Sequence, residues 1–160
     1  MRRAPRCLAA AAALALAAGG TVARAQAQAT YSCRLDGPQT VPFSSSTATG
    51  RASFSLDADL NLTYNFEFFN LQGAPVLINI HGPAGPGETG AERFVLIRGT
   101  NGSDVIGPIF ETRVIDWLNA GLLYMEAHTS LYPSGEIRGQ IYNTLAVEPR
   151  TWSAVKRLYD

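Results

Sequence analysis

Two histidines and the glutamate near the second one carry most of the metal-binding chemistry that this sequence offers. His81 ends a short apolar stretch, and His128 follows Glu126 by two positions. Imidazole nitrogen and carboxylate oxygen are ligands that zinc and copper both accept. Residues two apart on a β-strand point to the same side, so Glu126 and His128 could share one ion with His81. On this hypothesis the chain is a metal-binding envelope protein whose cofactor is copper or zinc.

A second interpretation gives both histidines a structural role. Asn79 stands two residues before His81, where another histidine would complete a strong ligand pair. A neutral amide is a poor ligand for these metals. The imidazoles of His81 and His128 would then hydrogen bond to the backbone at the mouth of the fold and shape the loops there. The sequence favours this interpretation, in which the protein has no cofactor.

Glu136 and Arg138 form the other candidate group. They are two residues apart, so on a strand they share a face with Gln140. The planar guanidinium suits the pinning of loops, and we expect an ion pair or a contact with a turn carbonyl. Recognition of an anionic ligand is the alternative, although no other basic residue lies nearby in the sequence.

Signatures of common enzymes are missing from the sequence. The residues after Gly82 are turn-formers and provide no nucleophile elbow. The glycine-rich segment 82–90 is not followed by a helix or a lysine, so it is not a phosphate loop. We therefore predict no catalytic residue and interpret the chain as a non-enzymatic binding or structural module, whose partner is an unknown protein or small ligand.

The register of the last hairpin, residues 124–142, decides which side chains meet. A two-residue loop at Pro133-Ser134 would turn Glu126 and His128 toward the apolar face, and a slip of one residue exchanges the faces. An odd-length loop or a bulge instead keeps Met125 on the apolar face. We predict the second register, with a polar cluster on the outer face made of Glu126, His128, Glu136 and Arg138.

Strict alternation of apolar and polar residues determines the expected fold. Residues 51–57 and 60–68 alternate with period two around the turn Asp57-Ala-Asp59, which indicates a hairpin. Other strands are expected at 30–35, 76–81, 93–98 and 105–112, and the stretch 93–98 is apolar on both faces, as in a covered strand. Residues 113–120 have the spacing of a short helix. We predict an all-β fold, an antiparallel two-sheet sandwich or squashed barrel of about eight strands.

The two ends of the chain differ from this pattern. Arg2, Arg3 and Arg6 precede the apolar run 7–18, and Ala23-Arg-Ala25 provides a small-residue cleavage site, which is the layout of a secretory signal peptide. The run is too short to span a membrane. We predict a signal peptide at 1–25, one β-domain at 26–143, and a tail or short docked helix at 144–160. The mature protein is then secreted or periplasmic, without a membrane span.

Charge and cysteine content narrow the class of partner. After residue 25 the chain has nine basic and 13 acidic residues, a net charge of −4. This balance argues against nucleic acid, which rewards a basic surface. Cleavage would also remove Cys7 and leave Cys33 alone, so we expect it to be a buried apolar residue in the first strand; an intermolecular disulfide is the alternative.

Several short segments occur in a characteristic order along the chain: 35–42 (LDGPQTVP), 48–54 (ATGRASF), 80–84 (IHGPA), Ala120-Gly121, Tyr124, His128-Thr129, Tyr132-Pro133 and 135–140 (GEIRGQ). Together they resemble the CHRD domain, a module named from chordin and also found in many exported bacterial proteins. The resemblance spans about residues 31–142 and implies an all-β barrel or sandwich with a distant likeness to copper/zinc superoxide dismutases; the molecular function of the family is not settled. Members often have His-x-His where this chain has Asn79 and His81, and Gly-Gly where it has Ser134 and Gly135.

Overall fold

In the computed structural model, which describes residues 29–144, the alternating stretches form a long hairpin of β2 (Thr49–Leu56) and β3 (Leu62–Phe69). Leu56 lies opposite Leu62, which confirms the predicted pairing. The carboxylate of Asp57 accepts hydrogen bonds from the backbone N–H groups of Asp59 and Asn61 and so stabilises the turn.

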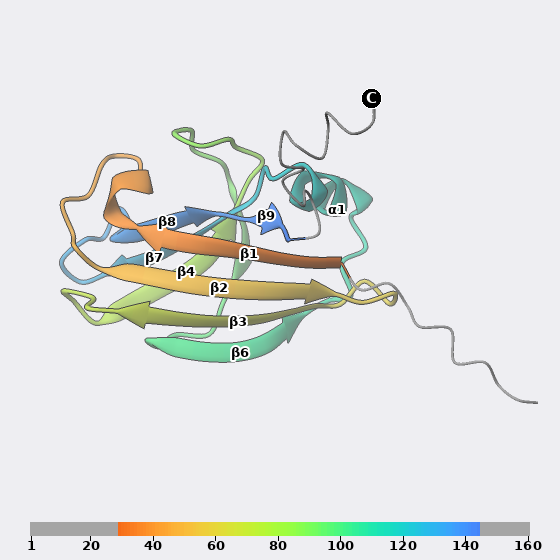
Figure 1. Cartoon of the computed structure of the whole chain (residues 1–160), viewed down its shortest axis with the longest axis horizontal. Coiled ribbons are helices and arrows are strands. Elements are labelled where there is room, and N and C mark those ends of the chain that lie inside the picture. Colours follow the sequence, from red (N-terminus) through yellow and green to blue (C-terminus); the bar gives the residue numbers. More distant parts are fainter. Residues whose placement is uncertain (1–28, 145–160) are drawn as a thin grey trace, which may run out of the picture.

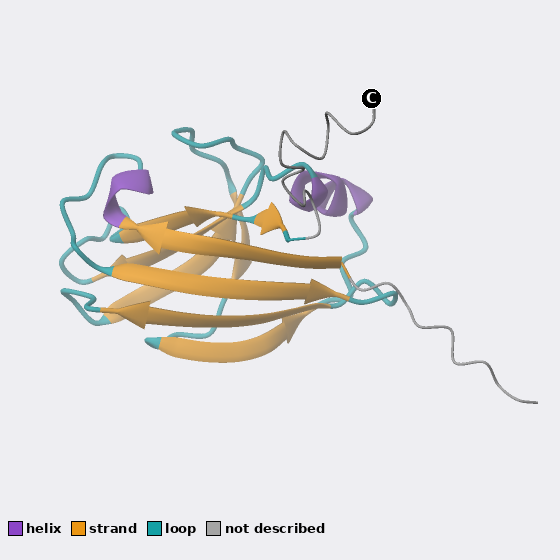
Figure 2. Ribbon diagram, viewed as in Figure 1, coloured by secondary structure: helices purple, strands orange, loops and turns teal. Residues whose placement is uncertain are grey.

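Eight strands follow one another in a single antiparallel sheet, and the short strand β9 pairs with β1. The spatial order is β5-β4-β7-β8-β1-β2-β3-β6, and the sheet curls into a nearly closed barrel with a short helix at one end (Figures 1 and 2). Besides β2 and β3, the elements are β1 (Ala29–Asp36), the 3-10 helix η1 (Gly37–Gln39), β4 (Pro75–His81), β5 (Glu92–Val95), β6 (Asn101–Ile106), α1 (Thr112–Asn119), β7 (Tyr124–Thr129), β8 (Ile137–Gln140) and β9 (Tyr142–Asn143).

The predicted fold class is confirmed, but two strands differ from the expectation. β5 ends at Val95, and the side chain of Val95 is 60% exposed. The prediction that 93–98 is covered on both faces is therefore wrong, because β5 lies at one edge of the sheet. β6 begins at Asn101, within a segment expected to be a loop. Its polar residues pair with β3 at the opposite edge, where one face is left to solvent.

The barrel interior is filled by the apolar residues of the alternating strands. Phe54, Phe66 and Ile80 are among its buried members, together with the helix residue Leu118. Cys33 is also buried, as predicted for the first strand. Burial raises the pKa of its thiol to about 12, so the thiol is unreactive at neutral pH.

Two predictions concern residues outside the described range 29–144. The signal peptide at 1–25 lies wholly outside it, as does nearly all of the tail or docked helix at 144–160. Within the described part of the chain, no helix has the length and apolar character needed to cross a membrane.

The last hairpin has the register that we predicted. Met125 pairs with Gly139, and Ala127 pairs with Ile137, so the loop between the strands has an odd length. Met125, Ala127 and Ile137 are fully buried in the core. Glu126 and Arg138 therefore point to the other face of the sheet, but they are not exposed there, because loops cover them.

Candidate functional site

The three predicted metal ligands lie on two neighbouring strands. β4 and β7 are antiparallel partners, with His81 opposite Tyr124, Asn79 opposite Glu126, and Leu77 opposite His128. Because alternate residues of a strand share a face, His81, Glu126 and His128 all project from the same side of the sheet. We call these three residues the His–Glu–His site.

The donor atoms of this site face one another. The Nε2 atom of His81 lies 3.9 Å from Oε2 of Glu126, and the Nε2 atom of His128 lies 3.7 Å from the same oxygen. One donor atom from each of the three residues lies within 4.8 Å of the other two. The structure thus brings together the whole ligand set proposed from the sequence.

Hydrogen bonds on the far side of each ring set its orientation. Nδ1 of His81 lies 3.1 Å from the carbonyl oxygen of Gly90, and Nδ1 of His128 lies 3.1 Å from that of Pro133. A carbonyl only accepts, so each neutral ring carries its hydrogen on Nδ1 and directs the lone pair of Nε2 toward Glu126. Such backbone contacts were expected from the structural interpretation, and they also characterise imidazoles that bind metals.

The two Nε2 atoms distinguish this arrangement from an ordinary structural one. Both are buried, and neither has a hydrogen-bond partner among residues 29–144. Buried polar atoms nearly always have a partner, since desolvation without one is costly. Two lone pairs directed at a carboxylate, without a proton donor between them, form a donor set suited to a cation.

Burial also determines the charge state of the site. It raises the pKa of Glu126 to about 7, while the positive charge of Arg138 acts in the opposite direction. Burial lowers the pKa of both imidazoles, only partly offset by their bonds to Gly90 and Pro133. Near neutral pH the histidines are therefore uncharged, and the carboxyl group loses its proton close to pH 7.

Aromatic and cationic side chains hold His81 in place from one side. The ring of Tyr124 is stacked on the imidazole, with 5.1 Å between centroids and 8° between planes. The guanidinium of Arg138 lies 3.6 Å from the centroid of Tyr124. The Tyr124 hydroxyl accepts a hydrogen bond from the backbone N–H of Gly90, the residue that also contacts His81. The ring therefore has little freedom to turn.

Arg138 and Gln140 fasten the glycine- and proline-rich loop 82–91 over the site. The guanidinium donates to the carbonyl oxygens of Gly85 and Glu88, at 3.0 and 2.6 Å. The Gln140 amide donates to the carbonyl of Ala84 at 2.8 Å. These are the contacts with turn carbonyls that the sequence predicted for Arg138, and no anion is needed to explain them.

Glu136 does not contribute to the predicted polar cluster. Its carboxylate accepts hydrogen bonds from the hydroxyls of Ser46 and Thr129 and from the backbone N–H of Gln72. Glu136 lies just before β8, and its contacts tie three separate segments together. The expectation that it lies with Glu126, His128 and Arg138 is corrected, because these partners draw the side chain away from them.

Gly135 leaves the space that Glu126 occupies. Its φ is +119°, a region that residues with side chains rarely adopt, and a Cβ here would collide with the Glu126 carboxylate. The contributions of Gly135 and Tyr124 to the site were not recognised from the sequence. Their positions in the hairpin could have placed both residues near Glu126 and His81, but only once the register of the hairpin was known.

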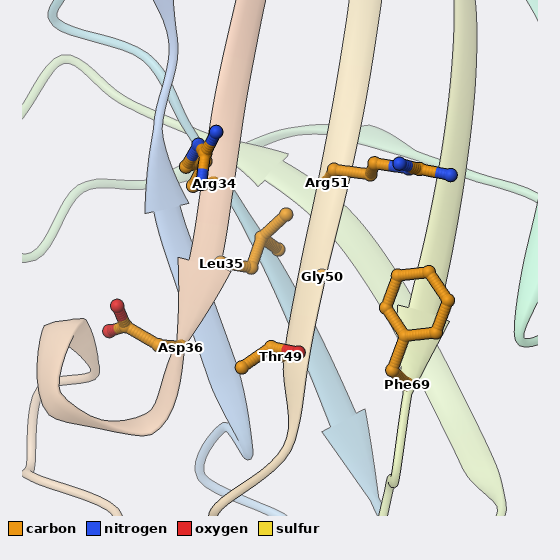
Figure 3. Close-up of a pocket in the computed structure, with 7 residues that line it drawn as sticks. All are labelled: Arg34, Leu35, Asp36, Thr49, Gly50, Arg51 and Phe69. Carbon is orange, nitrogen blue, oxygen red and sulfur yellow. The ribbon is translucent and has the colours of Figure 1, made fainter.

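A surface groove elsewhere on the described part of the chain holds no comparable set of groups. It has a volume of about 400 Å³ on β1, β2 and β3, with Arg34, Arg51 and Phe69 along it (Figure 3). Arg51 is already paired with Glu67 at 2.5 Å and lies against the ring of Phe69. None of the residues of the His–Glu–His site lines this groove.

Comparison with protein families matches residues 31–141 to the CHRD domain. No curated protein and no solved structure matches the chain.

Proposed function

The chain belongs to the CHRD domain family, and from the geometry of its His–Glu–His site we propose that it is an exported, non-enzymatic module that binds one zinc or copper ion at His81, Glu126 and His128. The observation that carries the proposal is the pair of buried, unpartnered Nε2 atoms on either side of one carboxylate. Export is supported by the extracellular location typical of CHRD domains and by the signal-like leader in the sequence.

The donor distances suit a single ion. Two ligands that bind one metal at about 2.0–2.1 Å lie about 3.4 Å apart at a tetrahedral angle, and at most about 4.2 Å apart. The separations from Glu126 to His81 and His128, 3.9 and 3.7 Å, lie between these two values. The two imidazole nitrogens are no more than 4.8 Å apart, so the three side chains must move toward one another when they bind one ion.

A structural role for the ion accords with its surroundings. The site joins β4 to β7, and its two rings contact the loops at Gly90 and Pro133. Both Nε2 atoms are shielded from solvent, whereas a catalytic metal needs a coordination position that a substrate can reach. We therefore assign the metal to stabilising the fold and these loops.

Metal content of the purified full-length protein tests this proposal. We expect one ion per chain by elemental analysis, and a rise in melting temperature when Zn²⁺ or Cu²⁺ is added to metal-free protein. His81→Ala and His128→Ala should abolish both effects, while Glu67→Gln, which alters an exposed carboxylate on β3, should retain them. Absence of bound metal together with an unchanged melting temperature in the unaltered protein would contradict the proposal.

A further inference from the structure

A third buried atom without a partner lies beside the two histidine nitrogens. Among the described residues, the side-chain atoms that are buried and lack a hydrogen bond are Nε2 of His81, Nε2 of His128 and Oδ1 of Asn79. Asn79 is only 2% exposed and stands directly opposite Glu126 in the pairing of β4 with β7. All three atoms therefore belong to one face of one strand pair, which is also the face that carries Glu126.

The orientation of the Asn79 amide follows from its other contact. Its Nδ2 atom donates to Oε2 of Glu92 at 3.0 Å. A carboxylate only accepts hydrogen bonds when ionised, so the nitrogen end of the amide must face Glu92 and the oxygen is the free end. The position across from Glu126 places this free oxygen within the polar face, since opposed side chains have Cβ atoms about 4.5–5.5 Å apart.

We infer that the side-chain oxygen of Asn79 is the fourth ligand of the metal, so that two nitrogens and two oxygens form a closed four-coordinate site for a zinc-class divalent ion. This inference rests on the proposed function. Four protein ligands in a tetrahedral arrangement are typical of structural zinc sites, whereas sites with three ligands keep a water molecule in the fourth position.

The usual weakness of an amide ligand is reduced at this position. An amide oxygen normally has to give up hydrogen bonds with water before it can bind a metal, and that loss is part of the cost. In Asn79 the oxygen is already desolvated and unpartnered in the folded protein, and its rotamer is held by Glu92. The amide that appeared from the sequence to weaken the metal site instead completes it.

Glu92 supports metal binding by Asn79 without being a ligand itself. Its carboxylate holds the amide of Asn79 through the hydrogen bond at 3.0 Å, and a negative charge beside the site favours a cation there. Glu92 is therefore a positioning residue, which orients the amide of Asn79 and contributes charge from the edge strand β5.

Cobalt(II) provides a spectroscopic test, because its visible absorption is strong in tetrahedral sites and weak in five- or six-coordinate ones. The full-length, metal-free protein is titrated with Co²⁺, and azide is then added as a probe for an exchangeable position. We expect strong absorption that azide leaves unchanged. In Asn79→Ala a water molecule should replace the amide, so that azide shifts the spectrum and the affinity for Zn²⁺ falls by at least about tenfold.

Matched variants separate coordination from folding. Asn79→Asp keeps an oxygen donor and should retain the strong absorption, and Asn65→Ala, at an exposed position of β3, should behave like the unaltered protein. If azide shifts the spectrum of the unaltered protein, or if Asn79→Ala binds Co²⁺ with the same spectrum and affinity, the inference is overturned while the proposed metal site stands. The azide result on the unaltered protein decides the question even if Asn79→Ala does not fold. If the unaltered protein binds no Co²⁺ or Zn²⁺, the proposed function fails as well.

Discussion

The two buried glutamates of the last hairpin stand in opposite situations. Glu136 accepts three hydrogen bonds, at 2.5–2.8 Å, from two hydroxyls and one backbone N–H. The carboxylate of Glu126 receives no hydrogen bond from the described residues, and it faces two imidazole nitrogens that also lack partners. A fully hydrogen-bonded carboxylate stabilises a fold, whereas one left without donors costs free energy unless a ligand compensates for it. The comparison separates a structural brace from a candidate binding site.

Removing the brace should have the largest effect on stability. Glu136→Ala leaves two buried hydroxyls and one backbone N–H without their acceptor, and we expect the free energy of unfolding to fall by about 3–5 kcal/mol. Urea denaturation would measure it, with Glu67→Ala on the exposed face as the control. The fraction that remains folded should bind Zn²⁺ normally. If the free energy of unfolding falls by less than about 1 kcal/mol, or if metal binding is lost, Glu136 does not have the purely structural role given to it here.

Changing Glu126 should weaken metal binding and leave the fold intact, the opposite of the result expected for Glu136. Glu126→Gln removes the one charged ligand, so the affinity for Zn²⁺ should fall by at least about 100-fold. The metal-free protein should not lose stability, and above pH 7 it should become more stable, because a neutral amide replaces a buried carboxylate that costs free energy when ionised. Calorimetric titration and urea denaturation of the same preparation give both quantities. Strong destabilisation with intact metal binding would reverse the comparison.

The pH dependence of binding tests the charge state of Glu126. The pKa of about 7 means that a proton competes with the metal below neutral pH. Burial lowers the pKa of both histidines, so protonation of the imidazoles competes with the metal less than it would at an exposed site. Affinity for Zn²⁺ should therefore rise about tenfold between pH 6 and pH 8, and the number of protons released per ion should fall from about one near pH 6 to nearly none near pH 8. An affinity independent of pH would show that Glu126 is already ionised or is not a ligand.

The smallest effect is expected at the residue that fastens the loop. Arg138→Lys keeps the positive charge but loses the planar fork that bonds to Gly85 and Glu88. We expect a loss of about 1–2 kcal/mol in stability and faster amide exchange across residues 82–91. The exposed Arg51→Lys, in which the pair with Glu67 is changed, should cost less than about 1 kcal/mol. Equal effects at the two arginines would contradict the role given to Arg138.

Much of the fold was predictable from the sequence, because the alternation of apolar and polar residues along each strand determines which face is buried. The alternation around Asp57 predicted the hairpin of β2 and β3, and the apolar side chain of Met125 predicted the register of β7 and β8. The limits of β5 and β6 were not predictable in the same way. Both are edge strands, where one-sided pairing permits polar residues in a strand and exposes apolar ones.

The candidate site was predictable only in part. Glu126 and His128 share a face through their spacing, but the approach of His81 depends on β4 lying next to β7, and β5, β6 and α1 separate these strands in the sequence. The partners of Glu136 likewise come from distant segments at Ser46 and Gln72. The role of Asn79 could not be inferred from its type alone, because it depends on burial and on the hydrogen bond to Glu92.

Competitive titration of Zn²⁺ against a coloured chelator, on metal-free full-length protein and on Glu126→Gln side by side, tests the central claim most directly. The account predicts that the unaltered protein withdraws one equivalent of Zn²⁺ from the chelator at pH 8 and that Glu126→Gln withdraws none. It is contradicted if the unaltered protein withdraws no zinc, or if both proteins withdraw the same amount.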